Sequence, residues 1–152
     1  MIEYVRSHFE GAFRLIFSGR RAQQVAALCY RQTHAGKRVL LITSRGTGRW
    51  IVPKGWPMEG LANSEAALQE AWEEAGVKSA EVQPDPVGHY RYTKYHARGG
   101  MTPVETEVYA AEVEALANNY PEGHERDRQW FSPAEAAEKV REPELKAILR
   151  DF

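Results

Sequence analysis

Residues 55–77 read GWPMEGLANSEAALQEAWEEAGV, a loop with two glycines that leads into a run rich in alanine and glutamate. The large and small apolar residues of segment 63–76 recur at i, i+3, i+4 and i+7, and they are Leu68, Ala71, Trp72 and Ala75. This is the spacing of one face of an α-helix, so the segment is predicted to be a helix that packs through these four residues. Asn63 or Ser64 is expected to cap its start, and Gly76 is expected to end it.

Three carboxylates share the same predicted helix. Glu70, Glu73 and Glu74 stand at i, i+3 and i+4, so they project from one side, and the segment holds no Lys or Arg to offset them. Two interpretations fit this pattern: a solvated acidic face, or a site for a hard cation such as Mg²⁺, which takes several oxygen ligands. The preceding loop favours the cation site, because Gly55 and Gly60 let the backbone come close to a ligand.

The stretch from Gly55 to Val77 resembles the Nudix box, the signature of the Nudix hydrolase family. The positions that match in register are Gly55, Glu70, Glu73, Glu74, Gly76 and Val77. Two positions depart from the box. Leu61 stands where the family has a glutamate, and Gln69 stands where it has an arginine that helps to orient the glutamates. Glu59, two positions before Leu61, is a candidate to replace the lost carboxylate.

The rest of the chain alternates between strand-like and helical patterns. Short β-prone runs are expected at Val25–Tyr30, Val39–Thr43, Trp50–Val52, Val87–Tyr95, Val104–Val113 and Gln129–Phe131. A helix capped by Ser132 is expected from Pro133, and a last one from about Glu142 to Arg150. This order predicts an α+β domain. With the resemblance, it implies a layered α/β/α sandwich: one Nudix domain over residues 1–152, a mixed β-sheet with the loop-helix and C-terminal helices, and residues 1–22 as an N-terminal covering segment.

The resemblance also implies a chemistry. It indicates hydrolysis of a phosphoanhydride bond with Mg²⁺ or Mn²⁺, held by Glu70, Glu73 and Glu74 with the carbonyl of Gly55. The same three glutamates are the expected catalytic residues, because metals on them would neutralise phosphate charge and activate a water. Glu73 is the first candidate for the general base. Glu107 and Glu125 are outside candidates, for which an exposed strand or loop carboxylate is the favoured interpretation.

Basic residues flank the box on both sides. Arg45, Arg49 and Lys54 precede it and Arg91 and Lys94 follow it, so together they are candidate phosphate contacts, although each alone fits a solvated surface charge. Between them, Tyr90, Tyr92 and Tyr95 are expected either to pack inward or to stack on a substrate base.

A particular branch is also suggested by local similarity. Residues Trp50–Gly55 and Gln129–Phe131 resemble the diphosphoinositol polyphosphate phosphohydrolases, a branch that also cleaves diadenosine polyphosphates. A dinucleoside polyphosphate, a diphosphoinositol polyphosphate or a related nucleoside-diphosphate derivative is therefore the expected substrate. The alternative is a catalytically weakened Nudix module that binds a nucleotide or another phosphorylated ligand.

Composition narrows the class of partner. The 152 residues carry 20 Lys+Arg against 21 Asp+Glu, a net charge of −1, which excludes a uniformly basic surface for nucleic acid or membranes. A small anionic substrate remains the expected partner, and the oligomeric state stays open. The first residues have no apolar signal-peptide core and the lone Cys29 needs no oxidising compartment, so a cytoplasmic protein with a buried, inert thiol is expected.

Overall fold

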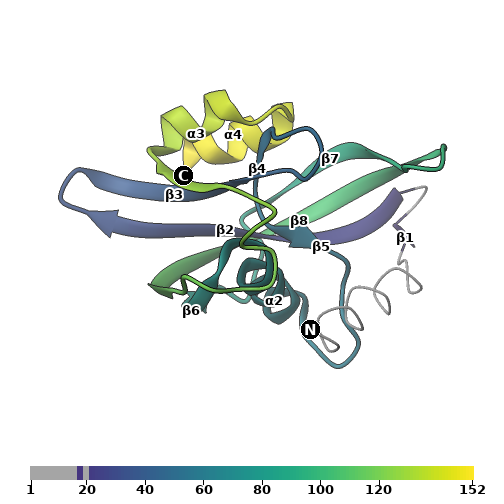
Figure 1. The fold of residues 1–152 in the computed structure, drawn as a ribbon. Helices are drawn as coiled ribbons and strands as arrows, with labels where there is room; N and C mark the ends of the chain where they lie inside the picture. The colour runs from purple at the N-terminus through teal and green to yellow at the C-terminus, as the bar shows by residue number, and fades with distance from the viewer. Residues whose placement is uncertain (1–16, 19–20) are drawn as a thin grey trace.

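The computed structural model describes residues 17–18 and 21–152 (Figure 1). Strand β1 (Phe17–Ser18) pairs antiparallel with the start of β2 (Arg21–Thr33). The predicted N-terminal covering segment, residues 1–22, lies largely outside the described residues and stays a prediction.

One mixed β-sheet forms the centre of the molecule. Its main path runs, in hydrogen-bonded order, through β4 (Trp50–Ile51), β3 (Gly36–Thr43), β2, β8 (Met101–Leu116) and β6 (Val77–Val82). The strands off this path are β5 (Lys54–Gly55) beside β2, β7 (Gly88–Tyr95) beside β8 and β9 (Arg128–Phe131) beside β3. The β2–β8 pair is parallel, whereas the hairpin neighbours β2 and β3 are antiparallel. The sheet is therefore mixed, as predicted.

Helices cover both faces of this sheet. Helix α2 (Asn63–Ala75) lies on one face, and α3 (Pro133–Lys139) and α4 (Pro143–Asp151) lie together on the other (Figure 1). This arrangement confirms the predicted layered α+β fold.

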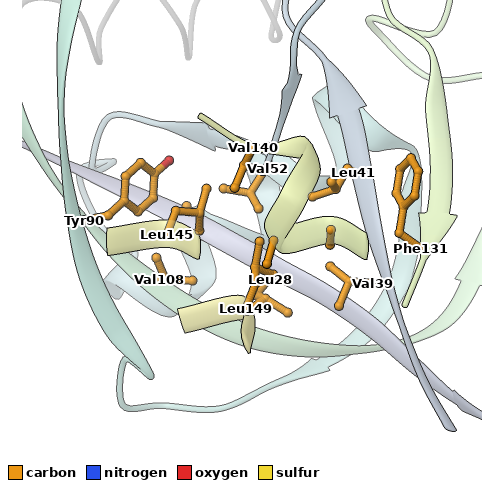
Figure 2. Packing of buried hydrophobic residues seen from close by; sticks show 13 residues of the cluster. Leu28, Val39, Leu41, Val52, Tyr90, Val108, Phe131, Val140, Leu145 and Leu149 are labelled. Carbon is orange, nitrogen blue, oxygen red and sulfur yellow. The ribbon is translucent and has the colours of Figure 1, made fainter. Parts of the chain in front are cut away.

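Strand β2 shows how one sequence serves both layers. Ala26 and Leu28 pack in the cluster under α3 and α4, where Figure 2 shows Leu28 near Leu149, whereas Val25 and Cys29 pack in the cluster under α2. Because successive strand residues point to opposite faces, a strand buried on both sides reads as a continuous apolar run. Burial raises the pKa of the Cys29 thiol to about 12, which agrees with the expected inert cysteine.

The predicted elements overlap observed ones, and three strands were not among the predicted runs, namely β1, β5 and the longer β6. All six predicted strand runs overlap observed strands, and Ser132 caps α3 by accepting the Glu135 N–H at 3.2 Å. Strand β6 was not predicted. It reads VKSAEV, with a buried Val77 but several exposed polar side chains, because it lies at the end of the strand order and pairs only with β8 in the described sheet.

Two details of α2 differ from prediction. Ala62, not Asn63 or Ser64, occupies the N-cap, and its N–H donates to the Glu65 carboxylate at 3.3 Å. The contact with the sheet is also different. Leu68 and Trp72 are only partly buried, and the fully buried apolar side chains of the helix are Ala66, Ala67, Ala71 and Ala75. These small residues let the helix lie close to the sheet, which turns the glutamates inward.

Candidate active site

The three glutamates of α2 are buried. The exposed fractions of Glu70, Glu73 and Glu74 are 2%, 1% and 5%. A solvated acidic face is therefore excluded. Buried carboxylates are costly unless cations and hydrogen-bond donors surround them, so their neighbours decide what the site can do.

Glu70 lies directly against the backbone of β5. A Cβ atom at Gly55 would stand 2.3 Å from both the Cδ and the Oε1 atoms of Glu70, far inside van der Waals contact. Residue 55 is therefore a glycine because the Glu70 carboxylate occupies the space where a side chain would begin. This contact couples the loop to the helix, as the predicted site requires.

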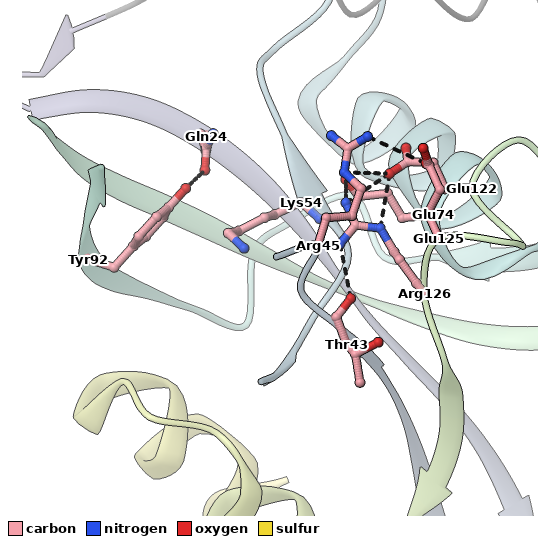
Figure 3. A network of polar contacts seen from close by, with 9 residues as sticks. All are labelled: Gln24, Thr43, Arg45, Lys54, Glu74, Tyr92, Glu122, Glu125 and Arg126. Atoms are coloured by element: carbon pink, nitrogen blue, oxygen red, sulfur yellow. Dashed lines mark hydrogen bonds and ion pairs between the residues drawn. The ribbon is translucent and has the colours of Figure 1, made fainter. Parts of the chain in front are cut away.

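Glu74 belongs to a network of alternating charges (Figure 3). Its Oε1 accepts the Lys54 backbone N–H at 3.1 Å, and its Oε2 lies 3.4 Å from Nη2 of Arg126. The same Nη2 lies 2.8 Å from Oε1 of Glu122, whose side chain is fully buried. On the outer side, Arg45 Nε is 3.6 Å from Glu122 and Arg45 Nη1 is 3.5 Å from Glu125.

Glu73 is held differently. Its Oε1 accepts a hydrogen bond from Nε2 of Gln69 at 3.0 Å, and its backbone carbonyl accepts the Glu122 N–H at 2.9 Å. Gln69 thus supplies a donor to the carboxylate group, but no charge, at the position where the Nudix box has arginine.

Burial shifts the pKa values of the ionisable groups in this cluster. Desolvation, followed by repulsion from Glu74 and Glu73, raises the pKa of Glu70 well above its ordinary value. Desolvation raises the pKa of Glu74 to about 7, although Arg126 and Lys54 oppose the rise. Desolvation also lowers the pKa of the Lys54 ammonium to about 8, against the attraction of Glu74.

A cavity of about 430 Å³ opens beside the helix. The predicted site residues that line it are Arg45, Arg49, Lys54, Gly55, Glu70, Glu74 and Lys94. Among the described residues, Glu73 and Arg91 do not belong to this lining. Arg91 instead lies 3.5 Å from Glu105, its cross-strand neighbour on β8, so we leave it out of the proposed site.

Three other carboxylates were candidates for the site: Glu107 and Glu125 as the general base, and Glu59 as a replacement for the carboxylate missing at Leu61. Glu107 accepts hydrogen bonds from Asn63 at 3.1 Å and from Tyr109 at 3.0 Å. Glu125 has a side chain that is 48% exposed and pairs with Arg45, and Glu59 is exposed in the loop. In the described chain, none of these three carboxylates is part of the cavity lining.

Sequence reasoning missed several residues that line the cavity. They include Gln24, Trp56, Arg126 and Arg141, whereas Tyr92 and Tyr95, which also line the cavity, were candidates for stacking on a substrate base. The aromatic residues contact cations: Lys94 Nζ lies 5.1 Å from the Trp56 ring centroid, and Lys54 Nζ lies 5.2 Å from that of Tyr92. Alternation along β7 does not pick out this set, because the consecutive residues Tyr92 to Tyr95 all line the cavity, whereas Tyr90 is buried.

The donor set suits a hard divalent cation. Carboxylate oxygens with a nearby backbone carbonyl are what Mg²⁺ and Mn²⁺ prefer, and the cradle that Gly55 leaves for Glu70 brings loop and helix together. Within residues 17–18 and 21–152, no three acidic, His or Cys side chains already converge on one point. Glu74 is held by Arg126 and Glu73 by Gln69, so an ion would bind the oxygen lone pairs that these contacts leave open, with the carboxylates drawn closer together.

Comparison with known proteins identifies the family. The family model of the NUDIX domain matches residues 21–152, which include strands β2 to β9, helix α2 and the residues that line the cavity. The chain belongs to the Nudix family. The resemblance of residues 55–77 to the Nudix box is thereby confirmed.

Curated Nudix relatives lie near 30% identity. Nudix hydrolase 13, mitochondrial, of Arabidopsis thaliana is 30% identical over 76% of this chain and 59% of its own length. Diphosphoinositol polyphosphate phosphohydrolase 3-beta of Homo sapiens is 29% identical over 75% of this chain and 66% of its own length. The chain therefore spans about 60% of the length of the first curated relatives that it matches.

Solved structures share the Nudix fold at lower identity. The Ap4A hydrolase of C. elegans superposes with a TM-score of 0.60 at 22% identity, covering 87% of this chain and 96% of that one. The NUDIX domain of Shewanella oneidensis NrtR, in complex with ADP ribose, gives a TM-score of 0.62 at 19% identity, covering 99% and 95%. In the described part of this Nudix chain, no helix is long and apolar enough to cross a membrane.

Proposed function

We propose that this Nudix protein is a metal-dependent hydrolase that cleaves a phosphoanhydride bond in a small polyanionic substrate. The observation that carries the proposal is the pairing of buried glutamates with a cation-rich cavity. Six basic residues line the cavity against two carboxylates, and they are Arg45, Arg49, Lys54, Lys94, Arg126 and Arg141. A concave site lined by this many basic side chains favours phosphate groups over neutral ligands.

The glutamates supply the metal site in this proposal. Glu70, Glu73 and Glu74 would hold Mg²⁺ or Mn²⁺ with the carbonyl of Gly55. When bound, the ion supplies charge neutralisation at the phosphates and a more acidic water. Lys54 has two roles: its backbone N–H orients Glu74 at 3.1 Å, and its ammonium lies in the cavity, where it can bind a phosphate oxygen. The position of the three carboxylates on one rigid helix keeps their spacing fixed.

Arg49 and Lys94 bind the substrate in this proposal. Arg49 is held by Glu142, with an Nη1 to Oε1 distance of 2.7 Å, so its guanidinium is already oriented at the cavity wall. Such preorganised donors lose little conformational entropy when they bind a phosphate. Lys94, beside Trp56, occupies another part of the lining.

The substrate class follows from the relatives and the cavity together. We propose a dinucleoside polyphosphate, a diphosphoinositol polyphosphate or a related nucleoside-diphosphate derivative, as the names of the similar proteins suggest. A nucleic acid polymer or a membrane is not part of the proposal, since the net charge is −1. We also propose a cytoplasmic location, which fractionation of the native cells would test.

A hydrolysis screen tests the proposal. The panel contains diadenosine polyphosphates, inositol pyrophosphates, nucleoside triphosphates and ADP-ribose, each with Mg²⁺, with Mn²⁺ or with excess EDTA. Metal-dependent release of phosphate or nucleotide from at least one substrate, lost in Glu70→Gln and Glu74→Gln, is the expected result. Binding of a ligand without turnover under every condition would instead support the catalytically weakened module.

A further inference from the structure

Arg126 is the buried cation at the centre of the glutamate network. Its side chain is 7% exposed, and it donates to three groups at once. Nη1 lies 3.1 Å from the Thr43 carbonyl, Nε and Nη2 lie 3.0 and 2.8 Å from Glu122, and Nη2 lies 3.4 Å from Glu74 (Figure 3). Each of the three guanidinium nitrogens therefore has a fixed acceptor.

The segment that carries Arg126 is itself tied to α2. The Glu122 N–H donates to the Glu73 carbonyl at 2.9 Å. The carboxylate of the same residue accepts a hydrogen bond from Nε of Arg126, four residues later. Helix α2 has no basic residue of its own. The cation that faces its carboxylates thus comes from a loop about fifty residues later, which is fixed to both the helix and strand β3.

We propose that Arg126 is a positioning residue that fixes the Glu74 carboxylate for metal binding. This inference rests on the proposed function, in which Glu74 is a metal ligand. Both oxygens of Glu74 are held from outside the helix, Oε1 by the Lys54 N–H and Oε2 by Arg126. A carboxylate held in this way has less rotational freedom to lose when the ion arrives.

The geometry requires arginine rather than any cation. A guanidinium presents its donors in a rigid planar fork, whereas a lysine ammonium is a point charge on a flexible stem. Lysine at position 126 keeps the charge beside Glu74 but cannot contact Thr43, Glu122 and Glu74 together. The Arg126→Lys variant therefore separates orientation from charge.

Mn²⁺ binding measures this role directly. The full-length wild type and Arg126→Lys are titrated with Mn²⁺, and free ion is counted by electron paramagnetic resonance. Loss of an outer-shell partner typically weakens metal affinity about 10–100-fold, and we expect that loss in Arg126→Lys. A second variant, Arg126→Met with Glu122→Gln, removes both buried charges together, so that neither is left unpaired. It should lose affinity to a similar degree.

Arg128 provides the matched control. It lies two residues later, and its Nη1 donates to the Ala75 carbonyl at 2.8 Å, so it supports the same helix without contacting a glutamate. Arg128→Lys should lower the thermal midpoint while leaving the Mn²⁺ dissociation constant within twofold of the wild type. All titrations are made well below the lowest thermal midpoint in the set.

The possible results are distinct. Unchanged affinity in both Arg126 variants would overturn the positioning role, and tighter binding would show that the guanidinium competes with the ion for Glu74. An equal loss in Arg128→Lys would show a general effect of instability and would also overturn it. If the wild type itself binds no Mn²⁺, the proposed function fails, and the inference fails with it.

Discussion

Replacing Gly55 by alanine places a methyl group where the Glu70 carboxylate lies. The added carbon would stand 2.3 Å from Cδ and Oε1 of Glu70 and 2.7 Å from Oε2. Non-bonded carbons make optimal contact at about 3.5–4.0 Å, so the carboxylate has to retreat by more than about 1 Å. Glu70 is only 2% exposed, and its movement is therefore resisted by the surrounding protein.

The expected cost is that of an overpacked interior. Such insertions typically lower the free energy of unfolding by about 1–3 kcal/mol. For a chain of this size, each kcal/mol corresponds to about 2–4 °C in the thermal midpoint. Urea unfolding of the metal-free protein measures the loss, and Mn²⁺ titration of the same variant should show weaker binding because a proposed ligand has moved.

A double-mutant cycle isolates the contact. In a Glu70→Ala background the carboxylate is gone, so Gly55→Ala should cost much less there than in the wild type. The two costs should differ by about 0.5–3 kcal/mol, the range found for residues in direct contact. An equal cost in both backgrounds would refute the reasoning, because the strain would then come from the backbone of β5 and not from Glu70.

Three further predictions concern ionisation. Glu70→Gln should raise the free energy of unfolding of the metal-free protein at neutral pH, as measured by urea unfolding. The reason is that the amide avoids burying a carboxylate whose pKa is raised by desolvation and by Glu74 and Glu73. A less stable variant would contradict this. The metal-free wild type should lose stability as pH rises from about 4.5 towards 7, because burial raises the folded-state pKa of Glu74 to about 7 and the folded chain holds that proton more tightly. In urea unfolding across this window, the free energy of unfolding should depend less on pH for Glu74→Gln than for the wild type. An identical pH dependence would count against the raised pKa of Glu74. Cys29, whose pKa burial raises to about 12, should resist a thiol reagent at mildly alkaline pH and react only in urea; rapid labelling of the folded chain would disprove its burial.

Most of the fold could be predicted from the sequence because its apolar patterns are strong. The run from Val25 to Tyr30 has the apolar continuity of a strand buried on both faces, and β2 is such a strand. Strand β6 was not predicted because its exposed polar residues obscure the alternating pattern that is expected of a strand. The contact face of α2 was misjudged for a related reason. Sequence patterning favours the bulky Leu68 and Trp72 as core residues, whereas the narrow space above the sheet accepts alanines.

The site could be predicted only in part from the sequence, because some of its residues are brought together by tertiary contacts. The helical spacing of Glu70, Glu73 and Glu74 is a local property and can be seen in one segment. Arg126 lies in a loop with several charges, and nothing in its neighbourhood assigns it to a carboxylate on a helix 52 residues away in sequence. Its i+4 relation to Glu122 suggests an ion pair, but the position of that pair against α2 is set by β3 and β9.

The burial of the glutamates explains why a net charge of −1 is compatible with binding a polyanion. Three acidic side chains on a helix without basic residues oppose its stability, and burial increases that cost. The chain offsets part of it with Arg126 and the Lys54 N–H, and it leaves Arg49 and Lys94 at the cavity. A divalent ion would remove most of the remaining repulsion, so the folded state should gain stability from the ion that the proposed reaction needs. The local separation of charge, acidic on α2 and basic on the facing wall, therefore connects stability with the proposed chemistry.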